Sequence, residues 1–190
     1  MRRVLLSLMF AGCAESIRPD HLGDAGAIDV AVGNDAITPT GKVTTVPRGD
    51  GSSTTLVDAS SMTDWIHLDF DTAGELDATG PWELRFQRFH ISTQAGVEVA
   101  PVADRAFADV TESPATGWRG DADVDGDTVV DYAFDQGDGW YDYDDMTHVL
   151  TPKPIVWVVR AGATQLKLEL LDYYDPAGTS GWLTFHWGTL

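Results

Sequence analysis

The chain has 190 residues, of which 43% are hydrophobic and 7 are tryptophan, and its formal net charge at pH 7 is −18. This length and this hydrophobic content suffice for one domain with a buried core, and they exclude a wholly disordered chain. The negative charge argues against nucleic acid as a partner, because a phosphate backbone is bound by a basic face.

The first twelve residues have the layout of a secretory signal peptide. Arg2 and Arg3 form a basic start, and the apolar run 4–10 is shorter than the roughly 20 residues that cross a bilayer. Two small residues then precede Cys13, an ending that resembles the lipobox of bacterial lipoproteins, although Phe10 stands where that pattern prefers Leu. Cys13 is the only cysteine, so it has no disulfide partner within the chain, and we predict that it is lipidated. The alternative is an ordinary signal peptide followed by a coincidental cysteine.

Residues 13–42 are predicted to form a flexible tether. They are rich in Gly, Ala, Asp and Thr, contain few aromatic residues and show little periodicity. A strand-like pattern begins near Val43, and the sequence predicts one domain over residues 43–190.

Within that domain, apolar side chains recur at every second position along several short segments, which is the periodicity of β-strands. In the segment 82–91 the alternation changes phase between Phe86 and Phe89, and we expect a β-bulge there. Turn residues separate the segments and no amphipathic helix is predicted, so the fold class is all-β, with a single antiparallel domain. The predicted strands lie in 65–70, 82–91, 130–134, 155–159, 166–170 and 183–187.

An acidic stretch follows the pattern D-x-D-x-D-G, which forms the front of many Ca²⁺-binding loops. The twelfth position of a standard loop would be Tyr132, which cannot supply the required carboxylate, and flanking helices are not predicted, so this is no EF-hand. Two interpretations stay open: a Ca²⁺-binding turn on a β scaffold, or a solvated acidic loop. The candidate ligands are Asp121, Asp123, Asp125, Asp127 and Asp131.

Several motifs resemble those of the HmuY-like family of haem-binding bacterial lipoproteins. The segment 82–96, WELRFQRFHISTQAG, is similar to the family pattern W-D-L-A-F-x-R-x-x-I-x-T-N-G-G, and 139–143, GWYDY, is similar to a G-W-Y-x-Y segment of many members. Residues 158–185 resemble the C-terminal signature of the family, which includes a Tyr-Tyr pair and a G-x-h-T-F strand. The resemblance spans 65–187, and its departures, Glu83, Arg85 and Gln94-Ala95, fall in the first hairpin.

The resemblance implies an exported, lipid-anchored protein of the bacterial outer membrane or cell surface. Such a protein would bind haem for iron acquisition and pass it to an outer-membrane receptor.

Haem binding requires an apolar slot and axial donors such as His or Met. Met146 and His148 lie in the region that corresponds to one ligand loop of the family, and Trp140, Tyr141 and Tyr143 could form a stacking wall. No histidine occurs between Thr111 and Gly139, so the two-histidine arrangement of better-known members does not carry over, and His90 is the candidate second donor. An exposed loop histidine is the alternative interpretation of His148. We expect the remaining histidines, His21, His67 and His186, to be solvated.

The sequence favours binding over catalysis, because it contains no G-x-S-x-G, H-E-x-x-H or P-loop motif. Two hypotheses therefore stand: a haem-binding outer-membrane lipoprotein, and a non-haem surface lipoprotein with a structural or adhesive role, with Ca²⁺ as a stabilising ion.

Overall fold

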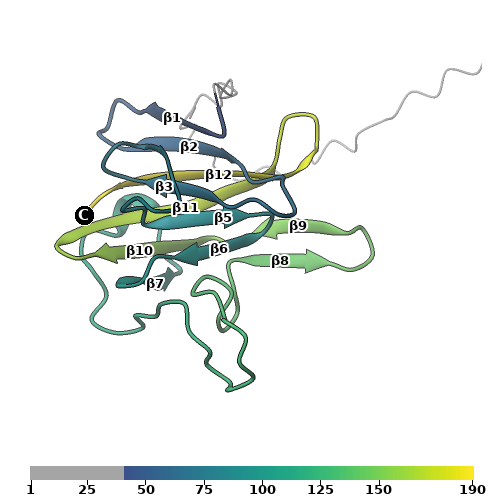
Figure 1. Cartoon of the computed structure of the whole chain (residues 1–190). Coiled ribbons are helices and arrows are strands. Elements are labelled where there is room, and N and C mark those ends of the chain that lie inside the picture. Colours follow the sequence, from purple (N-terminus) through teal and green to yellow (C-terminus); the bar gives the residue numbers. More distant parts are fainter. Residues whose placement is uncertain (1–40) are drawn as a thin grey trace, which may run out of the picture. The chain divides into compact units, whose positions relative to one another are not determined.

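The computed structural model describes residues 41–190, and these are almost entirely β (Figure 1). Cys13, His21 and nearly all of the predicted tether lie outside the described residues. In chain order the elements are β1 (Val43–Pro47), β2 (Ser53–Asp58), β3 (Ile66–Asp69), β4 (Gly74–Leu76), β5 (Leu84–Gln87), β6 (His90–Thr93), β7 (Val97–Ala103), the short 3₁₀ helix η1 (Phe107–Asp109), β8 (Tyr141–Asp144), β9 (Val149–Pro152), β10 (Ile155–Ala161), β11 (Thr164–Tyr174) and β12 (Ser180–Thr189).

The strands form two main sheets and one separate hairpin. The larger sheet has the order β1-β2-β12-β11-β10-β7, the smaller has the order β4-β3-β5-β6, and β8 pairs only with β9. Each of these pairings is antiparallel, which confirms the predicted all-β antiparallel class. No helix among residues 41–190 is long and apolar enough to cross a membrane.

Aromatic rings join the two main sheets across the core. Phe86 of β5 stacks on Phe185 of β12, with ring centroids 5.7 Å apart, and Phe70 meets Trp187 edge-on at 4.8 Å. Burial of this apolar surface is the main stabilising term of such a sandwich. It follows directly from the alternation in the sequence, since every second side chain of a strand points to the same face.

The connection between β5 and β6 is a tight turn, so the predicted β-bulge is wrong. Gln87 pairs with His90, which leaves Arg88 and Phe89 as the two turn residues, and Arg88 has a φ of 54°. The turn accounts for the change of phase, because β5 and β6 are separate strands whose apolar residues, Phe86 and Ile91, face each other across the pair.

Residues 130–134 are not a strand, contrary to the sequence-based prediction. Asp131 forms only an isolated bridge with Ala122, while Phe134 is buried and Val130 is 52% exposed. The segment instead closes the acidic loop, which projects from the domain, as does the β8–β9 hairpin (Figure 1).

Candidate functional site

The β8–β9 hairpin presents two of the predicted haem ligands. Met146 at its turn is 89% exposed, and His148 is also exposed. Asp144 fixes the turn, because its carboxylate accepts hydrogen bonds from the backbone N–H of Met146 at 2.8 Å and of Thr147 at 3.2 Å. These hydrogen bonds hold the pKa of Asp144 below its ordinary value. The turn is therefore held in one conformation, and it leaves the thioether of Met146 and the imidazole of His148 accessible.

His148, the last residue of the turn before β9, is oriented by a neighbour on β8. Its Nδ1 lies 2.8 Å from the hydroxyl oxygen of Tyr143. When Nδ1–H donates to that hydroxyl, Nε2 carries the lone pair that a metal ligand needs. A hydrogen bond on the second ring nitrogen is the usual way in which a ligating histidine is held in one tautomer.

The three predicted stacking aromatics occupy different environments. Trp140 is only 1% exposed, and its indole N–H donates to the carbonyl of Phe89 at 3.1 Å, so this ring belongs to the core and not to a surface wall. Tyr141 is half-buried, and burial together with the nearby charge of Asp135 raises the pKa of its hydroxyl. Tyr143 is 51% exposed and is the aromatic ring that the hairpin offers to a ligand.

His90 lies at the base of the acidic loop. Its Nδ1 is 3.2 Å from a carboxylate oxygen of Asp135, and its ring contacts Tyr132 and Phe89. In the described part of the chain, no hydrogen bond or ring contact joins His90 to Met146 or His148. A cavity of about 300 Å³ lies near this base and is lined by Asp135, Gly137, Asp138, Gly139, Tyr141, Asp142 and Tyr143.

The predicted calcium ligands fall into two groups. Asp121 is committed to the fold, because its carboxylate accepts hydrogen bonds from Ser92, Thr93 and the backbone N–H of Ala133, and so attaches the acidic loop to β6. Asp123, Asp125 and Asp131 place carboxylate oxygens within 4.8 Å of one another. Asp127 accepts a hydrogen bond from the backbone of Val129, within the loop.

The fold has close counterparts among solved structures, although no family model and no curated protein matches the sequence. A "putative lipoprotein" from Bacteroides fragilis aligns with a TM-score of 0.58 and 22% identity over 75% of this chain and 91% of its own. A "putative HmuY_like heme binding protein" from Bacteroides vulgatus aligns with a TM-score of 0.58 and 18% identity, over 72% of this chain and 91% of its own. An apo HmuY analog from Tannerella forsythia aligns with a TM-score of 0.55 and 16% identity, over 81% of this chain and 97% of its own. The chain has the HmuY-like fold.

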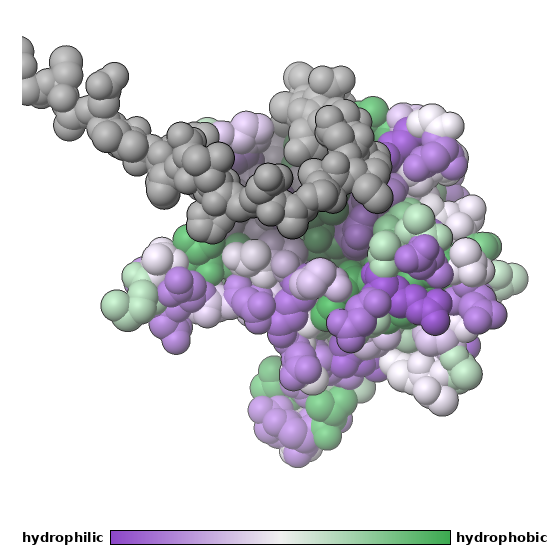
Figure 2. Space-filling model, turned by 180° about the vertical axis from the view of Figure 1, so that it is seen from behind, coloured by the Kyte–Doolittle hydropathy of each residue, from purple (hydrophilic) through white to green (hydrophobic). Residues whose placement is uncertain are grey.

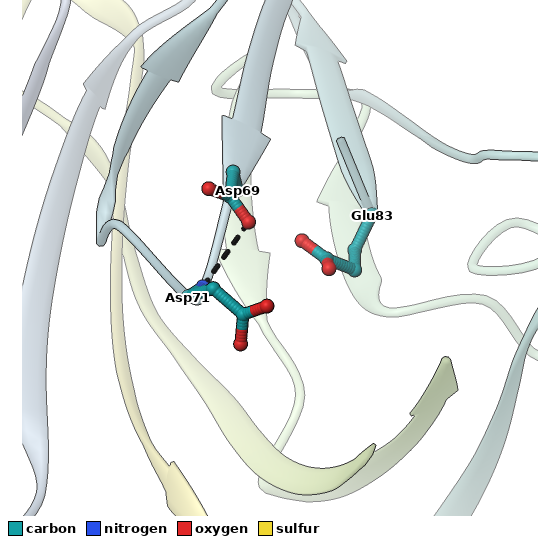
Figure 3. A group of neighbouring side chains, drawn as sticks. All are labelled: Asp69, Asp71 and Glu83. Atoms are coloured by element: carbon teal, nitrogen blue, oxygen red, sulfur yellow. Dashed lines mark hydrogen bonds between the residues drawn. The ribbon is translucent and has the colours of Figure 1, made fainter. Parts of the chain in front are cut away.

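The HmuY-like domain also holds a carboxylate cluster that the sequence analysis missed. Asp69 at the end of β3, Asp71 in the following turn and Glu83 just before β5 place carboxylate oxygens within 4.8 Å of one another (Figure 3). Asp69 is 5% exposed, and its carboxylate accepts hydrogen bonds from the backbone N–H of Asp71 and from the backbone N–H and hydroxyl of Thr72. Their spacing in sequence is irregular, and only the pairing of β3 with β5 brings them together.

Two histidines of this HmuY-like domain are buried, so the expectation that they are solvated is wrong. His67 is 8% exposed and packs against Trp82, and burial lowers its pKa. His186 is 9% exposed: Nε2 lies 2.7 Å from Ser52 Oγ and Nδ1 lies 3.1 Å from Glu169 Oε1.

The Ser52–His186–Glu169 arrangement has the connectivity of a hydrolase triad, but its surroundings indicate a structural role. The hydroxyl of Ser52 also lies 2.5 Å from Asp50, which competes with His186 for the single hydroxyl proton. The ring of Phe107 stacks on the imidazole at 3.8 Å and covers it. These contacts fasten η1 and the β1–β2 turn to the large sheet.

Proposed function

We propose that the chain is an exported, lipid-anchored protein of the outer membrane that binds haem at the β8–β9 hairpin and delivers it to a membrane receptor. The observation that carries the proposal is the hydrogen bond between His148 Nδ1 and the Tyr143 hydroxyl, because the tautomer in which Nδ1–H donates has its lone pair on Nε2, where a metal is bound. The name of the Bacteroides vulgatus protein supports haem as the ligand, and that of the Bacteroides fragilis protein supports a lipid anchor.

The residues on the hairpin fit a haem bound from one side. His148 supplies an imidazole, Met146 supplies a thioether, and the exposed ring of Tyr143 offers an apolar face to the macrocycle. Residues 111–139 contain no histidine, so His148 would hold the group without a second histidine from that loop.

The test is the absorbance spectrum of the protein mixed with haemin. We expect a shifted, sharpened Soret band that His148→Ala abolishes or moves, because the imidazole is the stronger donor. Met146→Ala should act mainly on the ferrous form, since a soft thioether prefers the softer iron. Tyr143→Phe should weaken binding about 10- to 100-fold, the usual effect of losing a hydrogen bond to a ligating histidine. Thr151→Ala, on the exposed face of β9, is the matched control, and absence of any Soret change in either redox state would refute haem binding.

A second candidate function is a non-haem surface lipoprotein with a structural or adhesive role, stabilised by Ca²⁺. The convergence of Asp123, Asp125 and Asp131 favours it, because hard cations bind clustered carboxylate oxygens. Millimolar Ca²⁺ should then raise the melting temperature, by an amount that corresponds to about 2.7 kcal/mol when the ion is at 100 times its dissociation constant.

Calorimetry with Ca²⁺, with Mg²⁺ and with Asp125→Asn separates site binding from general charge screening. The Asn side chain keeps the oxygen that accepts the N–H of Asp127, so the loop should survive the substitution. An equal shift in wild type and Asp125→Asn, or no shift at all, would leave the loop as a solvated turn.

A further inference from the structure

The end of the domain that carries the proposed haem site is almost purely acidic. Residues 120–152 include ten aspartates and not one lysine or arginine. The loop tip mixes these charges with exposed valines, and Figure 2 shows hydrophilic and hydrophobic residues side by side on the lowest projection. Seven of the ten carboxylates are exposed, namely Asp123, Asp125, Asp127, Asp138, Asp142, Asp144 and Asp145.

Few cations offset this charge. The ammonium group of Lys153 donates a hydrogen bond to the backbone carbonyl of Asp138, and its Nζ lies 3.5 Å from a carboxylate oxygen of Asp142. Arg119 is half-buried, with its guanidinium over the ring of Trp157 at 5.0 Å, so it is held by the core. The cavity near the base of the hairpin is therefore lined by carboxylates and two tyrosines, with Lys153 beside it and the guanidinium of Arg119 next to Gly137 of its lining.

Haem is an apolar disc with anionic propionates along one edge. The disc suits the tyrosine rings, but the propionates meet like charges, and among the described residues only Asp142 of this end has a lysine or arginine within 4.0 Å. Exclusion of water by the ligand strengthens that repulsion. Repulsion between exposed charges is screened over about 10 Å at 0.1 M salt, so its effect on binding must depend on ionic strength.

Building on the proposed haem-binding function, we infer that this acidic end selects tetrapyrroles by charge: the ligand binds with its carboxylates turned to solvent, and a tetrapyrrole without carboxylate charge binds more tightly than haem. Carboxylate recognition normally uses arginine or lysine side chains, and residues 120–152 have none. The site therefore presents carboxylates where a site that binds propionates would present arginine or lysine side chains.

The experiment uses the full chain and a Soret titration with haemin, corrected with a protein-free blank. Raising NaCl from about 20 mM to about 500 mM, which shortens the screening length several-fold, is expected to tighten haemin binding several-fold. Haemin dimethyl ester, compared with haemin in the same non-ionic detergent, is expected to bind more tightly.

Charge variants assign the effect to this end of the domain. The triple variant Asp138→Asn, Asp142→Asn, Asp145→Asn should bind haemin more tightly at low salt and lose most of the salt dependence. None of these three side chains accepts a backbone hydrogen bond in the described residues, so the hairpin should keep its fold. The matched control removes the same charge elsewhere, from exposed side chains, with Glu75→Gln, Asp77→Asn and Glu112→Gln.

The failure of this inference differs from the failure of haem binding itself. If haemin binds but salt or the triple variant weakens or does not change its affinity, charge selection is wrong and the haem proposal stands. Binding that appears only at high salt or in the triple variant supports charge selection. If neither haemin nor its ester changes the Soret band under any of these conditions, both proposals are overturned.

Discussion

Glu83 is a carboxylate held in unfavourable surroundings. Burial is the largest cause that raises its pKa, and the charges of the neighbouring Asp69 and Asp71 (Figure 3) raise it further. The N–H of Phe70, which donates to Oε2 at 3.0 Å, lowers it. A folded-state pKa above the unfolded value means that the folded protein binds the proton more strongly. The stability contributed by protonated Glu83 is therefore present at acid pH and is lost as the pH rises above the ordinary value of 4.5.

Glu83→Gln should accordingly raise the melting temperature near pH 7. The amide oxygen can still accept the N–H of Phe70, while the charge that is costly to bury is gone. The advantage should shrink as the pH falls below about 4.5, where the wild-type carboxyl is also neutral. Thermal unfolding at both pH values, with the exposed Glu75→Gln as control, measures this. A lower melting temperature for Glu83→Gln at pH 7 would contradict the assigned cause.

At the scale of elements, the turn between β5 and β6 shows what the sequence could and could not predict. Alternation predicted a single strand over 82–91, because it reports which face is buried and not where the chain reverses. It could not predict the turn, since Arg88 has a positive φ that its tertiary contacts favour: Nη1 donates to the carbonyls of Ser60 and Ser180, and Nη2 donates to the hydroxyl of Ser180. Trp140 was misplaced for the same reason, because its partner is the carbonyl of Phe89 in that turn.

Gly181 allows this part of the chain to pack closely. Its φ is +94°, and a Cβ there would lie 2.8 Å from Ser60 Cα and 2.9 Å from Arg88 Nη1. Gly51 has a similar φ of +85° but open space around it, so it is a matched control. Gly51→Ala should lower the free energy of unfolding by about 1–2 kcal/mol, because of the backbone conformation alone. Gly181→Ala should cost about 1–3 kcal/mol more, because it also overpacks the contact. If chemical denaturation gives the two variants equal losses of unfolding free energy, the Arg88 side chain moves aside without cost.

At the scale of the whole molecule, the fold was predictable, and the contacts of the candidate site were predictable only in part. Period-two segments and the family motifs span the domain, and neither depends on exact side-chain placement. The site depends on which loop residues meet: the sequence indicated His148 and Met146, but not that Tyr143 orients the imidazole or that Asp121 is used to attach the acidic loop. Those contacts join residues whose separation in the sequence follows no period.

The charge of the whole molecule also bears on the proposed attachment to a membrane. With a net charge of −18, the chain has no electrostatic attraction to anionic lipids, so membrane attachment should depend on the lipid at Cys13. Cys13→Ser should therefore move the protein from the membrane fraction to the soluble fraction or block its maturation. Fractionation before and after a high-salt wash tests this, with Ser16→Ala as the control for a nearby change. A normally processed Cys13→Ser protein that stays in the membrane fraction would contradict lipidation and would require another membrane contact, independent of charge.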